Sequence, residues 1–245
     1  MSARVPKQRI DQLLVERGFA ESREKARALI LAGQVIVGGA RVDKAGQSVP
    51  LDSEILIPAR LRYVGRGGLK LEHALEHFHI GVGERVCIDI GASTGGFTDA
   101  LLQRGAARVY AIDVGSGQLD WKLRNDPRVV VREKLNARYI VFEDVGEFAG
   151  FIACDVSFIS ATLVMPAFVP LLKPDGEFVV LVKPQFEVGR GEVGKGGIVR
   201  NPALHQVACR KVEAEAMRLG FRTDIVESPI LGAEGNKEFL LYARH

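Results

Sequence analysis

Residues 86–102 constrain the fold of this chain more than any other stretch. The first five, 86–90, form a short and mostly apolar run that is typical of a buried strand. A turn with three glycines follows, and apolar residues then recur at helical spacing from Phe97 onward. A strand, a glycine turn and a helix open the nucleotide-binding α/β folds, because glycines let a ligand approach the backbone and the helix N-terminus offers free N–H groups.

The spacing of these glycines excludes two common nucleotide sites. The turn has the pattern Gly-x-x-x-Gly-Gly, whereas the dinucleotide fingerprint needs Gly-x-Gly-x-x-Gly, and no Gly-x-x-x-x-Gly-Lys-Ser/Thr loop occurs. A second strand is predicted at 108–113, and it ends in Asp113, whose carboxylate can accept hydrogen bonds from ribose hydroxyls. These two features predict a ligand that contains adenosine. The alternative is a capping aspartate in a plain α/β domain.

The composition favours a cytoplasmic protein with a sizeable core. The chain has 245 residues, of which 47% are hydrophobic, which is enough for one large domain and a small one. No apolar run approaches the length of a membrane span, and the first residues lack the apolar core of an export signal, so no stable membrane association is expected. Cys87, Cys154 and Cys209 are scattered without metal-ligand spacing, so we expect reduced thiols and no metal.

The basic charge is concentrated at the front of the chain. Residues 1–66 hold 12 Lys and Arg against 7 Asp and Glu, a balance of +5, while the remainder holds 21 against 23, a balance of −2. This asymmetry favours an anionic partner that docks on the front part. The alternative is a basic face that is only solvated.

Residues 1–60 predict a small α+β domain. Apolar residues at helical spacing predict two helices, and two short apolar runs around a glycine pair predict a hairpin. The expected features are a first helix ending at Gly18, a second capped by Ser22 and ended by Gly33, strands at 34–37 and 40–42 around Gly38-Gly39, and a further strand at 54–57.

The pattern from Arg9 to Val42 resembles the small RNA-binding domain that is shared by a small-subunit ribosomal protein, bacterial pseudouridine synthases and some aminoacyl-tRNA synthetases. The resemblance covers roughly residues 7–60. It implies contacts with the phosphates of structured RNA, which supply affinity rather than base identity. By this resemblance, the RNA-binding residues are Arg9, Arg23, Lys25 and Arg27.

The rest of the chain alternates between strands and helices, which argues for a mostly parallel sheet with helices on both faces. After a linker at 61–68, this second domain covers 69–245. Its expected helices are 69–78, 119–123, 159–172 and 203–219, and its expected strands are 86–90, 108–113, 129–131, 151–155, 176–183 and an antiparallel pair at 221–227 and 238–243. The polar, glycine-rich segment 186–198 is a candidate substrate lid.

Three ionisable residues stand at the carboxyl ends of predicted strands, where open α/β sheets bind ligands. They are Asp113, Asp155 and Lys183. Lys183 follows the apolar core of a strand and precedes a proline, so it is held at the rim of the sheet. Beside Asp155 it would be an oriented amine suited to general-base work. The alternative is a lysine that extends into solvent.

These residues carry a resemblance to the FtsJ-type ribose 2′-O-methyltransferases, which use S-adenosylmethionine. That family has a catalytic set of lysine, aspartate, lysine and glutamate, which the resemblance assigns to Lys70, Asp155, Lys183 and Glu238. Together with the front domain, the stretches 65–71, 89–98, 154–160 and 182–187 resemble the TlyA family of ribosomal-RNA cytidine 2′-O-methyltransferases, which have also been labelled haemolysins. The implied fold is the Rossmann-like class I methyltransferase sheet.

The resemblance also implies a cofactor, a partner and a mechanism. The cofactor is S-adenosylmethionine, and the partner is ribosomal RNA or a ribosomal subunit. The implied cofactor-binding residues are Gly91, Ser93, Gly95, Gly96, Phe97, Asp113, Asn136 and Asp155. In the implied mechanism, Lys183 is oriented by Asp155 and Glu238 and receives or stabilises the proton of the ribose 2′-hydroxyl. Lys70 holds a phosphate of the nucleotide or the reacting hydroxyl.

Four other functions compete with this interpretation. A pore-forming haemolysin needs membrane-inserting segments, which the sequence lacks. A dehydrogenase needs a different glycine spacing. A non-catalytic RNA-binding protein has no need of lysines and acids at strand ends. A pseudouridine synthase needs a catalytic domain with a nucleophilic aspartate, which cannot be located in this chain.

Overall fold

The structure is a computed structural model, and it describes residues 5–31, 34–56, 62–232 and 235–245. The chain divides into two compact units, Met1–Leu61 and Arg62–His245. The expected linker, 61–68, begins at the boundary between the two units. Its first residue, 61, is outside the described residues. Residues 62–66 belong to the second unit and lead directly into its first helix at Gly67.

In its described residues, the first unit contains two helices and two small antiparallel sheets. Its elements are β1 (Lys7–Arg9), α1 (Ile10–Glu16), α2 (Arg23–Leu31), β2 (Ile36–Val37), β3 (Ala40–Arg41), β4 (Ser48–Pro50) and β5 (Ile55–Leu56). One sheet pairs β1 with β4, and the other has the order β3-β2-β5. The two helices, the hairpin and the β5 strand were predicted, but β1 and β4 were not, since their three-residue segments carry no apolar alternation. The expected helix end at Gly33 and residue 57 lie outside the described residues.

Local sequence signals explain the turns of this unit. The Ser22 hydroxyl accepts a hydrogen bond from the backbone N–H of Lys25 (3.2 Å), which confirms the predicted N-cap of α2. Gly38 and Gly39 have φ angles of +57° and +81°. A two-residue hairpin with the favoured twist needs positive φ at both positions, and glycine supplies it without steric cost.

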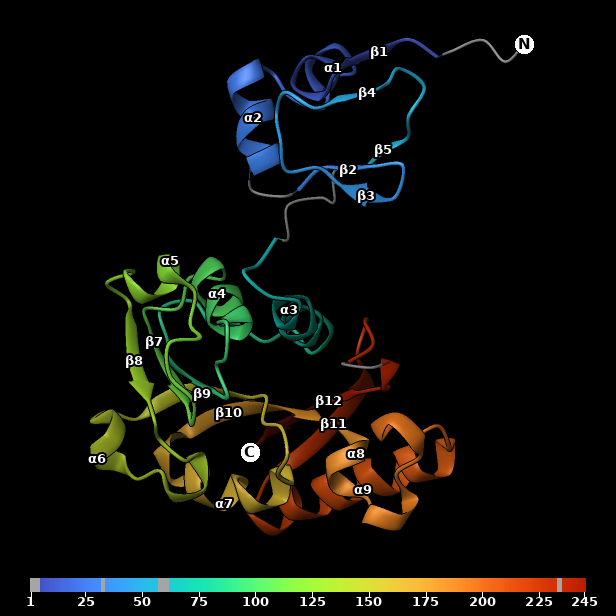
Figure 1. The fold of residues 1–245 in the computed structure, drawn as a ribbon. Coiled ribbons are helices and arrows are strands. Elements are labelled where there is room, and N and C mark those ends of the chain that lie inside the picture. The colour runs from blue at the N-terminus through green and yellow to red at the C-terminus, as the bar shows by residue number, and fades with distance from the viewer. Residues whose placement is uncertain (1–4, 32–33, 57–61, 233–234) are drawn as a thin grey trace. The chain divides into compact units, whose positions relative to one another are not determined.

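The second unit is built on one seven-stranded sheet (Figure 1). Its strands are β6 (Val86–Ile90), β7 (Arg108–Asp113), β8 (Val129–Glu133), β9 (Ala149–Cys154), β10 (Leu172–Val182), β11 (Arg222–Glu227) and β12 (Phe239–Arg244). The order is β11-β12-β10-β9-β6-β7-β8. The five strands from β10 to β8 are parallel, while β12 runs antiparallel to both β10 and β11. The predicted fold class is therefore confirmed.

Helices cover both faces of this sheet (Figure 1). They are α3 (Gly67–His77), α4 (Gly96–Gln103), α5 (Trp121–Arg124), α6 (Phe142–Val145), α7 (Met165–Phe168), α8 (Pro184–Glu187) and α9 (Pro202–Arg218), with 3₁₀ turns η1 (Ala137–Tyr139), η2 (Ala161–Leu163), η3 (Val169–Leu171), η4 (Arg190–Glu192) and η5 (Lys195–Gly197). Within the described ranges, none of the helices combines the length and the apolar character that a bilayer crossing requires.

Alternation along β10 separates two hydrophobic cores. Phe178, Val180 and Val182 pack with α7 and α9, whereas Val179 and Leu181 pack with α3 and α4. Successive side chains of a strand point to opposite faces, so a strand that is apolar at every position must be buried on both. This confirms the prediction of a sheet covered on both sides.

The helix predicted at 159–172 is wrong. The segment forms η2, α7 and η3 instead, and no helical piece in it exceeds four residues. Pro166 and Pro170 each stand in the first turn of a new helical piece. Proline has no N–H and its ring clashes with the preceding turn, so apolar spacing alone could not sustain one continuous helix here.

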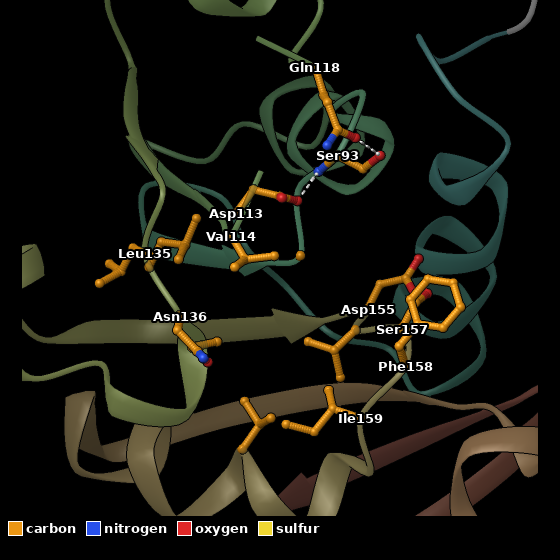
Figure 2. A pocket seen from close by; sticks show the side chains of 15 residues that line it. Ser93, Asp113, Val114, Gln118, Leu135, Asn136, Asp155, Ser157, Phe158 and Ile159 are labelled. Atoms are coloured by element: carbon orange, nitrogen blue, oxygen red, sulfur yellow. Dashed lines mark hydrogen bonds between the residues drawn. The ribbon is translucent and has the colours of Figure 1, made fainter. Parts of the chain in front are cut away.

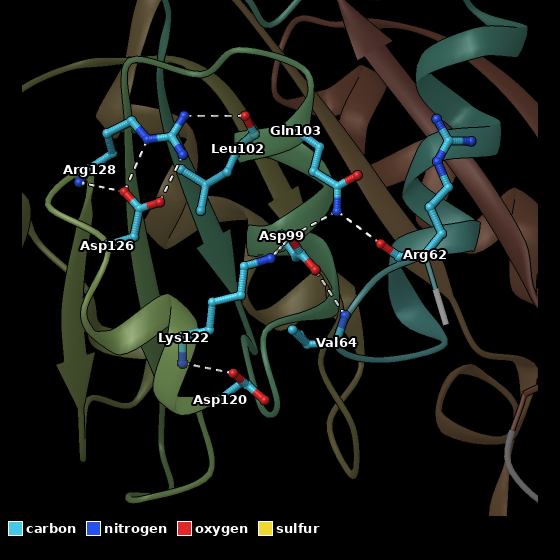
Figure 3. A network of polar contacts seen from close by, with 9 residues as sticks. All are labelled: Arg62, Val64, Asp99, Leu102, Gln103, Asp120, Lys122, Asp126 and Arg128. Atoms are coloured by element: carbon cyan, nitrogen blue, oxygen red, sulfur yellow. Dashed lines mark hydrogen bonds and ion pairs between the residues drawn. The ribbon is translucent and has the colours of Figure 1, made fainter. Parts of the chain in front are cut away.

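A polar network fixes the entry of the chain into this unit beside α4 (Figure 3). The Asp99 carboxylate accepts hydrogen bonds from the backbone N–H of Val64 (2.9 Å) and from Gln103 Nε2 (3.0 Å). The same Gln103 amide donates to the carbonyl of Arg62 (2.9 Å). Residues 62–64 are thereby held against the helix that follows the glycine turn, and α3 starts from this anchored position.

Candidate active site

The site lies where the order of the parallel strands reverses, between β6 and β9. These strands are neighbours in the sheet but are separated in sequence by β7 and β8. The backbone N–H of Asp155 donates to the carbonyl of Ile90 (2.8 Å), so the two strand ends lie side by side. Such a switch point leaves a crevice at the carboxyl ends of the strands, where open α/β sheets bind their ligands.

Gly91 is required by this junction itself. Its φ is +84°, and a Cβ at this position would lie 2.2 Å from the carbonyl oxygen of Asp155. Both facts exclude any larger residue. The glycine therefore serves the close approach of two strand ends, in addition to lining the cavity that opens beside them.

The first cavity has a volume of about 460 Å³ and collects predicted cofactor residues from four strand ends (Figure 2). Gly91, Ser93, Asp113, Asn136 and Asp155 line it. Its other walls are largely apolar and include Ile112, Val114, Leu135, Val156 and Ile159. A cavity with apolar walls and a few fixed polar groups is typical of a site for a small organic ligand.

The polar groups of this first cavity are fixed by the backbone. Asp113 accepts hydrogen bonds from the N–H of Ser93 (2.8 Å) and from the N–H of Gly115 (2.7 Å), one on each oxygen. Each carboxylate oxygen keeps a second lone pair for a ligand hydroxyl. The Asn136 side-chain oxygen caps η1 by accepting from the N–H of Arg138 (3.0 Å).

Gly96 and Phe97 line a small neighbouring cavity of about 130 Å³, together with Gly91 and Asp155. Gly95 lines neither cavity. Its φ is +98°, and a Cβ there would lie 2.2 Å from a methyl carbon of Leu123. Packing against α5, rather than an approach to a ligand, is the structural reason for glycine at this position.

The four predicted catalytic residues form two ion pairs. Nζ of Lys70 lies 2.5 Å from Glu238, and Nζ of Lys183 lies 2.5 Å from Asp155. A further cavity of about 370 Å³ is lined by Lys70, Lys183 and Glu238, while Asp155 stands at the wall of the first cavity. We call this further cavity the lysine cavity. Ser157 and Phe158 line both it and the first cavity, so the two are adjacent.

The pairing differs from the predicted mechanism in one respect. Glu238 was expected to orient Lys183, but its carboxylate bonds to Lys70 instead. Lys70 lies in the first turns of α3, where a cation opposes the helix dipole. The buried carboxylate of Glu238 compensates for that unfavourable position.

Sequence reasoning missed two polar residues of this site. Lys183 donates a hydrogen bond to the hydroxyl of Ser157 (2.8 Å). The buried carboxylate of Glu187 accepts from the Ser160 hydroxyl (2.5 Å) and the backbone N–H of Ala161 (2.7 Å). Both residues lie within four positions of a predicted catalytic residue, inside the quoted motifs, and this proximity was the available signal.

Asp89 is a third missed residue, and it is fully buried in β6. One of its oxygens accepts hydrogen bonds from the backbone N–H and the hydroxyl of Thr98 (2.8 and 2.6 Å), which joins β6 to the first turns of α4. Burial raises the pKa of Asp89 to about 7, because the charged form loses its hydration. Its place inside an otherwise apolar strand was the sequence signal.

The predicted RNA-binding residues lie in the first unit. Arg9 donates to both oxygens of the buried Asp11 (3.0 Å each), and Arg23 donates to one of them (2.9 Å). The hydrogen bonds from Arg9 hold the pKa of Asp11 well below its usual range. About half of each arginine side chain remains exposed. Lys25 pairs with Glu21, which lies just before α2, and Arg27 is exposed.

Two family models match the chain. The model described as FtsJ-like methyltransferase matches residues 63–245, and the model described as S4 domain matches residues 8–55. The chain is 46% identical over 239 residues to the 16S/23S rRNA (cytidine-2′-O)-methyltransferase TlyA of Mycobacterium tuberculosis. That alignment covers 96% of this chain and 89% of the relative.

Two solved structures share the fold of this chain. A protein from Streptococcus thermophilus, described as a haemolysin candidate, has a TM-score of 0.75 and 46% identity, covering 98% of this chain and 89% of that one. The O-methyltransferase of Bacillus cereus in complex with SAH has a TM-score of 0.52 at 19% identity, covering 76% and 84%, so it shares the fold. This chain belongs to the FtsJ-like methyltransferase family and carries an S4 domain in front of its methyltransferase domain.

Proposed function

We propose that the protein transfers a methyl group from S-adenosylmethionine to the ribose 2′-hydroxyl of a cytidine in ribosomal RNA. Two ion pairs carry the proposal, Lys70 with Glu238 and Lys183 with Asp155. Both lysines line the lysine cavity, which adjoins the first cavity. The name of the Mycobacterium tuberculosis relative supports the choice of ribosomal RNA and cytidine.

The lining of the first cavity suits an adenosine-bearing cofactor. Asp113 offers two backbone-fixed carboxylate oxygens to ribose hydroxyls, and Asn136 stands by the apolar walls where the adenine would lie. The small cavity beside Gly96 and Phe97 would hold the methionine part. When bound, the cofactor supplies a methyl carbon that accepts an electron pair from oxygen while its sulfur keeps the electrons of the broken carbon–sulfur bond.

Within this proposal, the chain's own residues handle the proton and the geometry. A ribose hydroxyl is a weak acid, so its oxygen gains nucleophilic character as its proton leaves for Lys183. Lys183 acts as this base in its neutral form, after its ammonium group has released a proton to solvent. Asp155 holds that amine beside the first cavity, and its negative charge stabilises the ammonium that forms. Lys70, held by Glu238, faces the same lysine cavity and would bind a phosphate or the reacting hydroxyl. Much of the acceleration would come from positioning.

The S4 domain would deliver the RNA. Asp11 holds the guanidinium groups of Arg9 and Arg23 in place, while about half of each arginine side chain stays exposed. Each guanidinium is therefore already oriented to bind a phosphate. Lys25 and Arg27 lie exposed on the same helix as Arg23. Contacts of this kind carry no sequence information, so the choice of nucleotide would rest with the methyltransferase domain.

The test uses purified protein, tritiated S-adenosylmethionine and ribosomal RNA or subunits from cells that lack this chain. We expect label on the ribose of a cytidine, recognised as a dinucleotide that resists alkaline hydrolysis. Lys183→Ala should abolish transfer while cofactor binding, measured by calorimetry, persists. Lys173→Ala is the matched control, because Lys173 is an exposed lysine near the opposite end of β10.

Three outcomes would overturn the proposal. They are label on a base, full activity of Lys183→Ala, and binding of RNA without any transfer. The last of these would favour the non-catalytic RNA-binding alternative.

A further inference from the structure

Lys183 makes two polar contacts of different kinds, an ion pair with Asp155 and a hydrogen bond to Ser157. Its Nζ lies 2.5 Å from Oδ1 of Asp155, yet within the described residues that oxygen accepts no hydrogen bond of regular geometry. The pair is therefore held mainly by charge, and attraction between charges depends little on direction. The contact to Ser157 is different, because Nζ donates a directed hydrogen bond of 2.8 Å to its hydroxyl.

Direction matters for an amine that must accept a proton. A neutral lysine amine has two N–H groups and one lone pair at tetrahedral positions around Nζ. Rotation about the Cε–Nζ bond exchanges these positions, and an ion pair alone does not stop it. A hydrogen bond to Ser157 fixes one position and thereby stops the rotation. Of the two other positions, the one on the side of Asp155 takes the second N–H, because the negative carboxylate repels a lone pair. The third position is left for the lone pair.

The segment that carries Ser157 is itself held in place. Phe158, the next residue, has a φ of +65°, a conformation that costs a non-glycine residue about 1 kcal/mol or more. Two and three residues further on, Ser160 and Ala161 both donate to the buried carboxylate of Glu187. Glu187 follows Lys183 by four positions on α8, and Lys211 of α9 pairs with it (3.1 Å).

Segments 155–161 and 183–187 are therefore joined at both ends. Lys183 contacts Asp155 and Ser157 at one end, and Glu187 contacts Ser160 and Ala161 at the other. The Ser157 hydroxyl stands at the edge shared by the first cavity and the lysine cavity. Its distance from Lys183 is set by the fold rather than by a flexible loop.

We infer that Ser157 is a positioning residue for Lys183, which turns the amine so that its lone pair faces the incoming ribose hydroxyl. The effect of this orientation on catalysis rests on the proposed function, whereas the contact itself does not. The proton passes from the ribose oxygen to Nζ, the oxygen keeps the electron pair and bonds to the methyl carbon, and the electrons of the broken carbon–sulfur bond stay on sulfur. Ser157 takes no proton and acts only through the orientation of Lys183.

The test compares Ser157→Ala, Ser157→Thr and the control Ser116→Ala in the full chain. Ser116 is exposed in the loop after β7 and lines none of the three cavities. We expect Ser157→Ala to lower kcat roughly 10- to 100-fold, since a misdirected group loses catalytic efficiency. The KM values for RNA and cofactor should stay within about twofold, because the hydroxyl acts after binding. Ser157→Thr keeps the hydroxyl and should restore kcat to within about threefold.

A second measurement does not depend on activity. Trace labelling with acetic anhydride, followed by peptide mass spectrometry, reports the reactivity of the Lys183 amine as a function of pH. An alanine at position 157 removes a hydrogen bond that favours the ammonium form, so the acidic limb of this labelling profile should move to lower pH. Ser157→Thr and Ser116→Ala should leave the limb where it is in the unmodified protein.

The two measurements separate the possible failures. If the labelling limb moves but the unmodified protein methylates no RNA, the proposed function fails while the contact stands. Unchanged kcat in Ser157→Ala overturns the positioning role whatever the labelling shows. An unmoved limb together with an equal loss of activity in the alanine and threonine variants would also overturn it, since both would then report a general disturbance of the segment.

Discussion

The ammonium group of Lys70 lies 2.5 Å from the carboxylate of Glu238, and neither side chain exposes more than a tenth of its surface. The two residues are 168 positions apart, so only the packing of α3 beside β12 brings them together. Two charges removed from water are tolerated as a pair, but each alone carries a large desolvation cost. Because both residues line the lysine cavity, a substitution that breaks this pair should also lower the stability of the domain.

Glu238→Gln should destabilise the protein by about 3 kcal/mol, because it leaves the Lys70 ammonium buried without a counter-charge. Urea unfolding at pH 7.5 measures this change. The matched control is Glu227→Gln, which breaks the exposed pair with Lys237 and should change the free energy of unfolding by less than about 1 kcal/mol. Equal effects of the two substitutions would contradict the assigned burial of the Lys70 pair.

Asp89 should make the stability of the protein depend on pH between about 4 and 8. Its pKa is raised by burial to about 7 in the folded state, whereas an unfolded aspartate titrates near 3.9. The folded state therefore binds the proton more tightly, so this stabilising contribution is complete below pH 4 and is lost as the pH rises through 7. The difference is of the order of a few kcal/mol.

Asp89→Asn removes this titration and keeps an oxygen that can accept from Thr98. We expect the free energy of unfolding, measured with urea, to fall more between pH 5 and pH 8 in the unmodified protein than in the variant. Other carboxylates, such as Asp11, contribute equally to both proteins and cancel in the comparison. Parallel pH profiles would show that Asp89 does not titrate in this range.

Much of the fold was predictable because strands that are buried on both faces are visible as apolar runs. Two of the parallel strands that lead into the site, β6 and β7, begin and end where the sequence predicted. The prediction of one helix at 159–172 was wrong because it rested on the spacing of apolar residues, whereas Pro166 and Pro170 interrupt the helix. The β1 and β4 strands were missed because their pairing, rather than their composition, defines them.

The site was predictable in its location but not in its contacts. Carboxyl ends of neighbouring parallel strands meet at one edge, so Asp113, Asp155 and Lys183 could be grouped from the sequence. Which carboxylate pairs with which lysine depends on how α3 and β12 pack, and Glu238 accordingly bonds to Lys70. The contact from Lys183 to Ser157 depends on the conformation of a loop, which no periodicity reveals.

Arg9→Gln and Arg23→Gln should each weaken RNA binding by the full-length protein and lower the slope of log K against log salt by about 1. Each change removes one phosphate contact in the proposed interface. Asp11→Asn keeps both arginines but releases their guanidinium groups, so affinity should fall while the slope stays the same. Filter binding to ribosomal RNA between 50 and 300 mM salt provides the measurement. Unchanged slopes in both arginine variants would place the RNA contacts elsewhere.

Gly95→Ala should destabilise the methyltransferase domain without lowering its affinity for the cofactor. Gly95 has a φ of +98°, and an added Cβ would lie 2.2 Å from Leu123 and 2.8 Å from Leu119, so the substitution combines backbone strain with overpacking. We expect a loss of about 2–4 kcal/mol in urea unfolding. Gly117→Ala is the matched control, because φ there is +72° and nothing lies within 4 Å of the added carbon, so only the strain of about 1 kcal/mol applies. If Gly95→Ala instead left stability intact and abolished cofactor binding in calorimetry, this glycine would have to contact the ligand directly.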